Sequence, residues 1–183
     1  MTLADFHHFK LTGSNDFAPC VWHMSGVLSQ SKSMNSSASN VGGWKLCAMK
    51  TWLNETVYTK LPKWWKKIIK QVEVLSTAGN KTATITVSDD YLFLLSAAEV
   101  GFGTDAPYGD EVDSGAYNKA MPIFTGSNAR IRKTANGTGS AQTWWLRSAD
   151  YSSTSNYRNV TNNGIAISTS AASGAYVAFG FCT

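Results

Sequence analysis

The chain contains 183 residues, of which 43% are hydrophobic, 12% aromatic and only 15% charged. This composition excludes a disordered chain, which requires high charge and few aromatic residues, and no apolar run approaches the roughly 20 residues of a membrane span. The formal charge of +4 arises in one segment, because five lysines without an acid lie between residues 60 and 70 and the other 11 basic and 12 acidic residues nearly cancel. The sequence therefore predicts one domain over residues 1–183 and gives little support to nucleic-acid binding.

The N-terminal part is predicted to contain one strand, a long loop and two helices. Residues 3–11 are mixed in polarity, which indicates an edge strand, and residues 12–43 are rich in Ser, Asn and Gly, which indicates loop and turns. A helix should begin near Trp44, with one apolar face formed by Leu46, Met49, Leu53 and Val57. A second helix is expected from Pro62 to Val72, with an inner face formed by Trp65, Ile68, Ile69 and Val72.

The remainder of the chain is predicted to consist mainly of short strands. Thr82 to Val87 alternates in polarity, which predicts a strand, and the compact apolar run from Tyr91 to Leu95 predicts a buried strand. Ser96 and Glu99 have the spacing of a helix capping box, so a short helical turn should follow. Residues 101–141 are Gly-rich and irregular. Further strands are expected at 143–147, 159–160, 164–168 and 175–181. Because strands and helices do not alternate, the fold class is α+β and not a parallel α/β sheet.

Five motifs occur in order along most of the chain, from about Asp5 to Cys182. They are N-V-G-G-W at 40–44, T-W-L-N at 51–54, F-L-L-S-x-x-E at 93–99, W-W-L-R-S at 144–148 and V-A-F-G-F-C at 177–182. The pattern resembles an uncharacterised bacterial and phage domain found in phage tail proteins and bacterial surface proteins. The resemblance implies a C-type-lectin-like fold of the formylglycine-generating-enzyme type, with two helices packed on a small twisted antiparallel sheet and long ordered loops. One departure is Ala149, which stands where Pro usually follows W-W-L-R-S.

The segment from Ala149 to Tyr176 is predicted to carry a binding surface within a binding region at 144–183. Thirteen of its 28 residues are Ser, Thr or Asn, and only Asp150 and Arg158 are charged. Tyr combined with Ser, Asn and Gly is typical of antibody paratopes, although the same composition also suits ordinary polar hairpins. The resemblance implies that retroelement-directed diversification acts near this position. The candidate ligand-binding residues are Asp150, Tyr151, Ser153, Asn156, Tyr157, Arg158, Asn159, Asn162, Asn163 and Tyr176.

Other residue clusters have simpler interpretations. Trp144, Trp145 and Arg147 are expected to form a core layer, with Arg147 satisfying a buried carboxylate or loop carbonyls. The lysine-rich helix with Trp64 and Trp65 is interpreted as an ordinary solvated face. No metal site is expected at His7, His8 and His23, and no cofactor is expected. A calcium site in the acidic residues Asp89, Asp90, Asp105, Asp110, Glu111 and Asp113 stays open. Cys20, Cys47 and Cys182 leave a disulfide open as well.

These observations lead to the hypothesis of a non-enzymatic recognition domain. Its partner would be a receptor, protein or glycan, on a bacterial cell, and its context a phage or prophage tail or a surface adhesin. The N-terminus shows no signal peptide, which suits a tail protein assembled in the cytoplasm. By analogy with tail proteins, a homo-oligomer such as a trimer is expected. The alternatives are a degenerate formylglycine-type oxidase or cell-wall hydrolase, and a structural module without a ligand.

Overall fold

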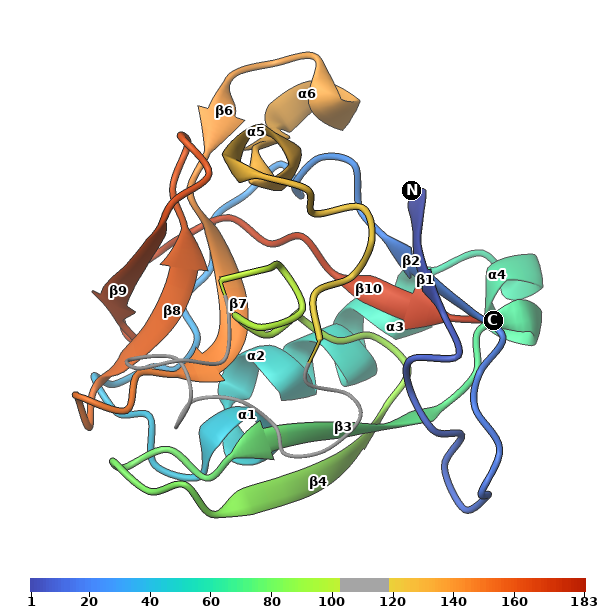
Figure 1. Ribbon diagram of the computed structural model, residues 1–183, viewed down its shortest axis with the longest axis horizontal. Coiled ribbons are helices and arrows are strands. Elements are labelled where there is room, and N and C mark those ends of the chain that lie inside the picture. The colour runs from blue at the N-terminus through green and yellow to red at the C-terminus, as the bar shows by residue number, and fades with distance from the viewer. Residues whose placement is uncertain (103–118) are drawn as a thin grey trace.

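The computed structural model describes residues 1–102 and 119–183, and it has a mixed α+β architecture. Helices account for 19% of the chain and strands for 32%, and the strands form several small antiparallel sheets. The α+β class is therefore confirmed. The expectation of two helices on one small sheet is too simple, because the described strands form four separate sheets; Figure 1 shows their arrangement.

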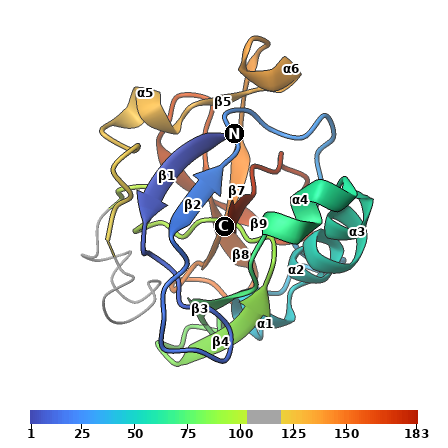
Figure 2. The ribbon, with the colours of Figure 1, turned by 90° about the vertical axis from the view of Figure 1, so that its right-hand side faces the viewer.

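Both ends of the described chain meet in one three-stranded sheet of order β1-β2-β10. Its strands are β1 (Thr2–Phe6), β2 (Cys20–His23) and β10 (Gly180–Cys182). β1 is an edge strand, as the sequence predicted, whereas β2 lies within residues expected to be loop. Figure 2 shows the broad faces of β1 and β2, with the C-terminus below the N-terminus and α4 beside the C-terminus.

The principal helical segment is broken near its start and widened in its middle. α1 (Gly43–Leu46) ends at Cys47, and a continuous helix then runs through α2 (Ala48–Thr51), the π-helix η1 (Trp52–Val57) and α3 (Tyr58–Lys60). Cys47 is extended (φ −76°, ψ 148°), and α2 starts anew because Asn35 Oδ1 accepts from the Ala48 amide at 2.8 Å. The break turns Leu46 outward, so this residue is 73% exposed and does not belong to the predicted apolar face.

The second predicted helix is much shorter than expected. α4 (Lys63–Ile68) ends at Ile69, and Val72 already begins strand β3 (Val72–Thr77). β3 pairs with β4 (Ile85–Asp90) in a hairpin whose turn holds Asn80 and Lys81 at positive φ. Ile68, placed on the inner face by its spacing, is 46% exposed. Nothing in the lysine-rich segment itself signals the change from helix to strand, which depends on pairing with β4.

The residues that follow β4 contain the capping box that the sequence predicted. Glu99 N donates to Ser96 Oγ at 3.2 Å, and Ser96 N donates to Glu99 Oε2 at 2.9 Å. The preceding residues, Leu92 to Leu95, are fully buried as expected, but only Phe93 forms a strand-like bridge, to Gly180. Short elements follow the undescribed residues: α5 (Ser127–Arg130), β5 (Arg132–Lys133), α6 (Thr134–Gly137) and β6 (Ala141–Gln142).

The C-terminal sheet has the order β7-β8-β9 and occupies the left side of Figure 1. It consists of β7 (Trp144–Ala149), β8 (Asn156–Val160) and β9 (Ala166–Ser170). All six residues of β7 are buried, because both of its faces are covered. Trp144 and Trp145 are therefore core residues, as the sequence indicated, and the predicted binding segment is carried on a rigid strand.

Candidate functional site

Four of the ten predicted ligand-binding residues are buried and help to hold the C-terminal sheet. Tyr157 is fully buried, and its hydroxyl donates to the Gly43 carbonyl oxygen at 2.9 Å. Asn159 is buried and exchanges hydrogen bonds with the Thr169 hydroxyl. Asp150 and Arg158 are buried and form an ion pair at 3.3 Å. A ligand cannot reach Tyr157 or Asn159 without opening the core, so their structural role accounts for them.

Asp150 organises the loop between β7 and β8. Its carboxylate accepts from the Ser152 amide at 2.9 Å, from the Ser152 hydroxyl at 2.7 Å and from the Ser168 hydroxyl. Burial raises the pKa of Asp150, but these hydrogen bonds and the Arg158 charge outweigh it and lower the pKa below its ordinary value. The loop is held from the other side by Asn40, whose amide nitrogen donates to the carbonyl oxygens of Ser153 and Asn156.

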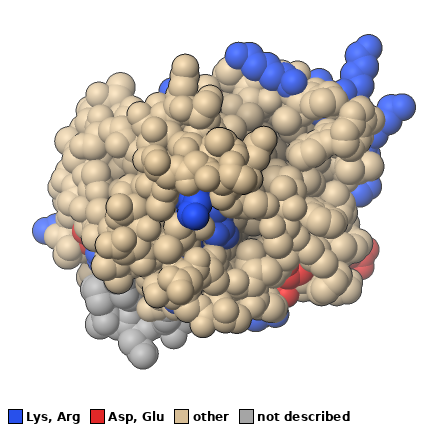
Figure 3. Space-filling view, turned by 90° about the horizontal axis from the view of Figure 1, so that it is seen from above, with Lys and Arg blue, Asp and Glu red and all other residues tan. Residues whose placement is uncertain are grey.

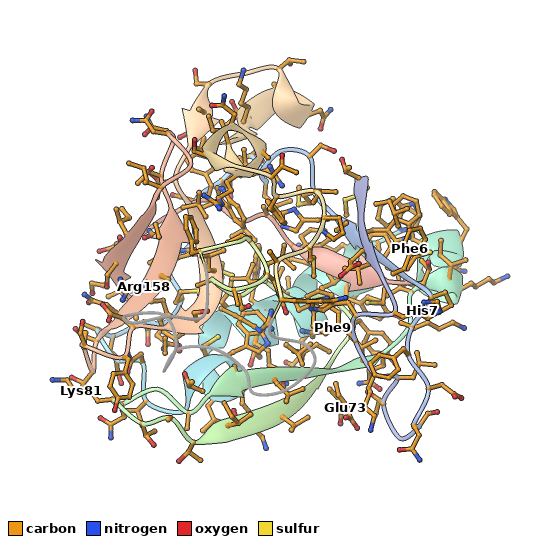
Figure 4. The ribbon with its side chains drawn as sticks, in the orientation of Figure 1. Phe6, His7, Phe9, Glu73, Lys81 and Arg158 are labelled. Carbon is orange, nitrogen blue, oxygen red and sulfur yellow. The ribbon has the colours of Figure 1, made fainter. Side chains whose placement is uncertain are left out.

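The predicted residues that do reach solvent lie at two ends of the sheet. Tyr151 is 38% exposed in the β7–β8 loop, whereas Asn162 and Asn163 are exposed in the β8–β9 turn at the opposite end of β8. Ser153, Asn156 and Tyr176 are half-buried. Figure 4 shows Arg158 on the left, on the side of the C-terminal sheet, and Phe6 and His7 on the right. The structure therefore does not gather the ten residues into one surface.

A network of buried charges connects two of the sequence motifs in the core. Arg147 forms two hydrogen bonds of 2.6 Å with the Glu99 carboxylate and also donates to the carbonyl oxygens of Leu75 and Leu94. His8 Nε2 lies 3.4 Å from Glu99, and His8 Nδ1 lies 2.9 Å from Asp5. Although burial opposes ionisation, the Arg147 charge and the His8 contact lower the pKa of Glu99 to about 2.

His8 shows the complementary shift, in which hydrogen bonds and charge from Glu99 and Asp5 overcome burial and raise its pKa. The network is closed to solvent, since Glu99, Arg147 and His8 are each at most 1% exposed. Arg147 thus satisfies a buried carboxylate and loop carbonyls, as the sequence analysis expected. Its chemistry is that of a structural ion pair and not of a substrate site.

A solvent-accessible pocket lies elsewhere, between the loop 28–32 and the π-helix η1. Its volume is about 300 Å³, and it is lined by Leu28, Ser29, Gln30, Ser31, Lys32 and Trp52. The Lys32 ammonium lies 5.0 Å from the centroid of the Trp52 ring. We call this the Trp52 pocket. An aromatic ring, a cation and several hydroxyl and amide groups around one hollow are the usual lining of a small-ligand site.

The walls of the Trp52 pocket are fixed by the backbone. Lys32 N donates to the Ala175 carbonyl at 2.9 Å, and the Lys32 carbonyl accepts from Trp145 Nε1 at 2.7 Å. The other wall is the π-helix η1. There the Asn54 side-chain amide donates to the carbonyl oxygens of Lys50 and Leu92, and its oxygen accepts from the Leu92 amide. The pocket therefore borders the C-terminal segment 172–176 without being formed by it.

Comparison with known protein families identifies one match. The sequence model of the family described as domain of unknown function DUF6273 matches residues 17–179. The chain belongs to the DUF6273 family. No curated protein and no solved structure matches it.

Most of the motif residues of this DUF6273 domain serve the core. The Asn40 side chain accepts a hydrogen bond from the Asn80 amide in the β3–β4 turn. Gly43 lies close to the Thr77 carbonyl, and the Trp44 indole donates to the Asp90 carboxylate. Trp52 differs from these residues, because it lies within T-W-L-N yet lines the Trp52 pocket. Sequence reasoning missed the pocket since Lys32 and Trp52 are 20 residues apart and Ser29 to Lys32 have no periodicity.

The sequence analysis left a calcium site and a disulfide open, and the described part of this DUF6273 domain bears on both. No cluster of three or more His, Cys, Asp or Glu residues there is arranged to hold a metal ion. Asp90 binds Trp44 and Ser88, while the calcium candidates Asp105, Asp110, Glu111 and Asp113 lie outside the described residues. Cys20, Cys47 and Cys182 are all free thiols. Within the same residues, no helix has the length and apolarity needed to cross a bilayer.

Proposed function

We propose that this DUF6273 domain is a non-enzymatic recognition domain that binds a receptor on a bacterial cell surface. The observation that carries the proposal is the Trp52 pocket, a rigid hollow beside the C-terminal segment in which polar side chains surround an indole and a lysine. The motif resemblance supports a C-type-lectin-like fold and a place in a phage tail or a bacterial surface adhesin. A homo-oligomer would then add avidity to a modest affinity per site.

The chemistry of the Trp52 pocket suits a saccharide that carries an acidic group. The indole offers an apolar face to the C–H groups of a sugar ring, and Ser29, Gln30 and Ser31 offer hydrogen bonds to its hydroxyls. Lys32 forms no ion pair with a described acid, so its ammonium is available to a carboxylate or phosphate. Of the two receptor classes considered, protein and glycan, this lining favours a glycan.

The predicted binding surface takes a smaller part in this proposal. Of the predicted residues in the β7–β8 loop, Tyr151 is exposed and remains a candidate for contact with a large receptor, together with its exposed neighbours Ser152 and Thr154, which were not predicted. Asp150 holds that loop through Ser152, whereas Tyr157 and Asn159 are buried and bind Gly43 and Thr169. In this proposal none of the three contacts the ligand. The enzyme alternatives gain no specific support, because the Asp5–His8–Glu99 chain is buried and burial raises the pKa of the Cys47 thiol to about 12.

Binding of the biotinylated chain, as a monomer and as streptavidin tetramers, to a panel of intact bacteria tests the proposal. Tetramers should bind selected strains, and Lys32→Glu should reduce binding at least tenfold without changing the melting temperature. Lys45→Glu is the matched control, since Lys45 is an exposed lysine on α1, away from the pocket. Acidic monosaccharides should compete better than neutral ones.

Three results would contradict the proposal. Absence of binding to every strain would favour the structural-module alternative. Equal binding by the Lys32→Glu and Lys45→Glu variants would remove the Trp52 pocket from recognition. Loss of binding in Tyr151→Ala alone, with Lys32→Glu unaffected, would return the site to the β7–β8 loop.

A further inference from the structure

A second exposed surface, unrelated to the Trp52 pocket, combines aromatic residues with lysines. Trp64 is 62% exposed, Phe6 56% and Ile68 46%, which is unusual for such large apolar side chains. Trp64 and Ile68 border a cavity of about 440 Å³ that is also lined by Trp22, Trp65 and Phe181 and by both ends of the sequence, Met1 and Thr183. We call the outward side of α4 and this cavity the Trp64 face.

The Trp64 face arises because α4 covers only part of the sheet beneath it. Trp22 and Phe181 are directly paired across β2 and β10, so their side chains share the outer face of that sheet. Trp65 packs on this face, with its ring centroid 5.2 Å from that of Phe181. Trp64 precedes Trp65 on the helix, is largely exposed and lines the same cavity.

Lysines flank the apolar strip on one side. At 100° per residue, Trp64 and Ile68 lie about 40° apart on α4, and Lys63, Lys66 and Lys67 follow on the adjoining sector. Lys60 and Lys70 are exposed at either end, and no acidic residue occurs between residues 60 and 70. Figure 3 shows basic side chains projecting along the upper right edge of the molecule, on the side where α4 lies. The surface is therefore both apolar and strongly cationic.

We propose that the Trp64 face docks on the surface of a lipid bilayer that carries anionic headgroups. Tryptophan prefers the boundary between headgroups and acyl chains, and a helix with bulky apolar residues beside lysines binds such a boundary in the plane of the membrane. Each lysine near an anionic bilayer strengthens binding about fivefold. Trp64 and Ile68 enter the boundary while the lysine side chains stay among the phosphates.

Charge and polarity make other occupants of the Trp64 face less suitable. A second copy of the chain would bring two groups of lysines together without an acid between residues 60 and 70 to offset them. A glycan would need hydrogen-bonding partners for its hydroxyls, but the side chains that line the cavity are almost entirely apolar. An anionic bilayer satisfies both the apolar strip and the lysines.

Co-sedimentation of the chain with vesicles tests the proposal. Vesicles of phosphatidylcholine with about one third phosphatidylglycerol should bind the chain at 0.1 M salt, and vesicles of phosphatidylcholine alone should bind it at least tenfold more weakly. Trp64→Ala should weaken binding about tenfold. Lys63→Gln with Lys67→Gln should weaken it about 25-fold, whereas Lys45→Gln should change it less than twofold.

The variants keep the test decisive, because Trp64, Lys63 and Lys67 are exposed and their melting temperatures should match that of the parent chain. Failure to bind the anionic vesicles overturns the proposal, and so does equal binding by Trp64→Ala. Dimerisation in analytical ultracentrifugation that Trp64→Ala abolishes would instead assign the face to a second copy of the chain. None of these outcomes depends on the Trp52 pocket, so the two proposals fail separately.

Discussion

The buried Glu99–Arg147 pair should control how the stability of the domain depends on pH. The pKa of Glu99 falls from 4.5 to about 2 in the folded chain, chiefly because the Arg147 charge and the His8 contact overcome the cost of burial. A carboxyl with a depressed folded pKa contributes stability above its unfolded pKa and loses it as the pH falls through the folded value. At about 1.4 kcal/mol per pKa unit, the gap corresponds to about 3 kcal/mol at neutral pH.

Glu99→Gln is the perturbation that isolates this contribution. The measurement is urea unfolding followed by tryptophan fluorescence at pH 5 and pH 3, a window in which His8 is protonated in both the folded and the unfolded chain. Over that window Glu99 should give up about 2 kcal/mol of its stabilisation. The parent chain should therefore lose about 2 kcal/mol more than Glu99→Gln on acidification, since Asp150 and the other carboxyls are common to both.

The same substitution should lower stability at pH 7 by about 3 kcal/mol, because it removes the carboxylate from the buried ion pair between Glu99 and Arg147. Replacing both partners, as Glu99→Leu with Arg147→Met, should recover much of that loss. Equal acid sensitivity of the parent and Glu99→Gln would refute the reasoning. It would show that Glu99 is not the group whose protonation weakens the fold.

Further predictions concern the frame around the candidate site. Gly43→Ala should destabilise the domain by at least about 2 kcal/mol in urea unfolding, because φ is +55° and the new Cβ would lie 1.8 Å from the Thr77 carbonyl oxygen. Asn40→Ala should cost about 3 kcal/mol by the same assay, since its amide holds the β7–β8 loop and the β3–β4 turn; a loss below about 1 kcal/mol would contradict this role. In native chain, iodoacetamide should modify Cys20 first by mass spectrometry, because Cys47 and Cys182 are buried and burial raises the pKa of both thiols.

Local sequence signals predicted the parts of the fold that depend on local physics. The Ser96–Glu99 capping box is an interaction between residues three apart, so its spacing was sufficient. The break at Cys47 was not predictable in this way, because the cap on Ala48 comes from Asn35, 13 residues earlier. The change from helix to strand before Val72 likewise follows from pairing with Asp90.

The candidate site was harder to predict because composition does not report which way a side chain points. The β8 residues Tyr157 and Asn159 match a paratope by type, yet β8 lies between two strands and both side chains are buried. For the Trp52 pocket, residue types gave no signal although the residues do line a site. Its loop residues are unremarkable in sequence and become a site only because the backbone of Lys32 is held by Ala175 and Trp145.

This distinction gives a sharp prediction for the diversification hypothesis. A diversified surface tolerates substitution, and in the predicted segment only the exposed positions satisfy that condition. In a saturation library over residues 149–163, displayed on yeast and sorted for folded protein, Tyr151, Asn162 and Asn163 should accept nearly every residue, whereas Asp150 and Tyr157 should accept almost none. Loss of the Asp150 carboxylate removes the hydrogen bonds from the Ser152 and Ser168 hydroxyls and the ion pair between Asp150 and Arg158. Wide tolerance at Tyr157 would mean that the loop is not held by this core, and that the surface for recognition is larger than the structure indicates.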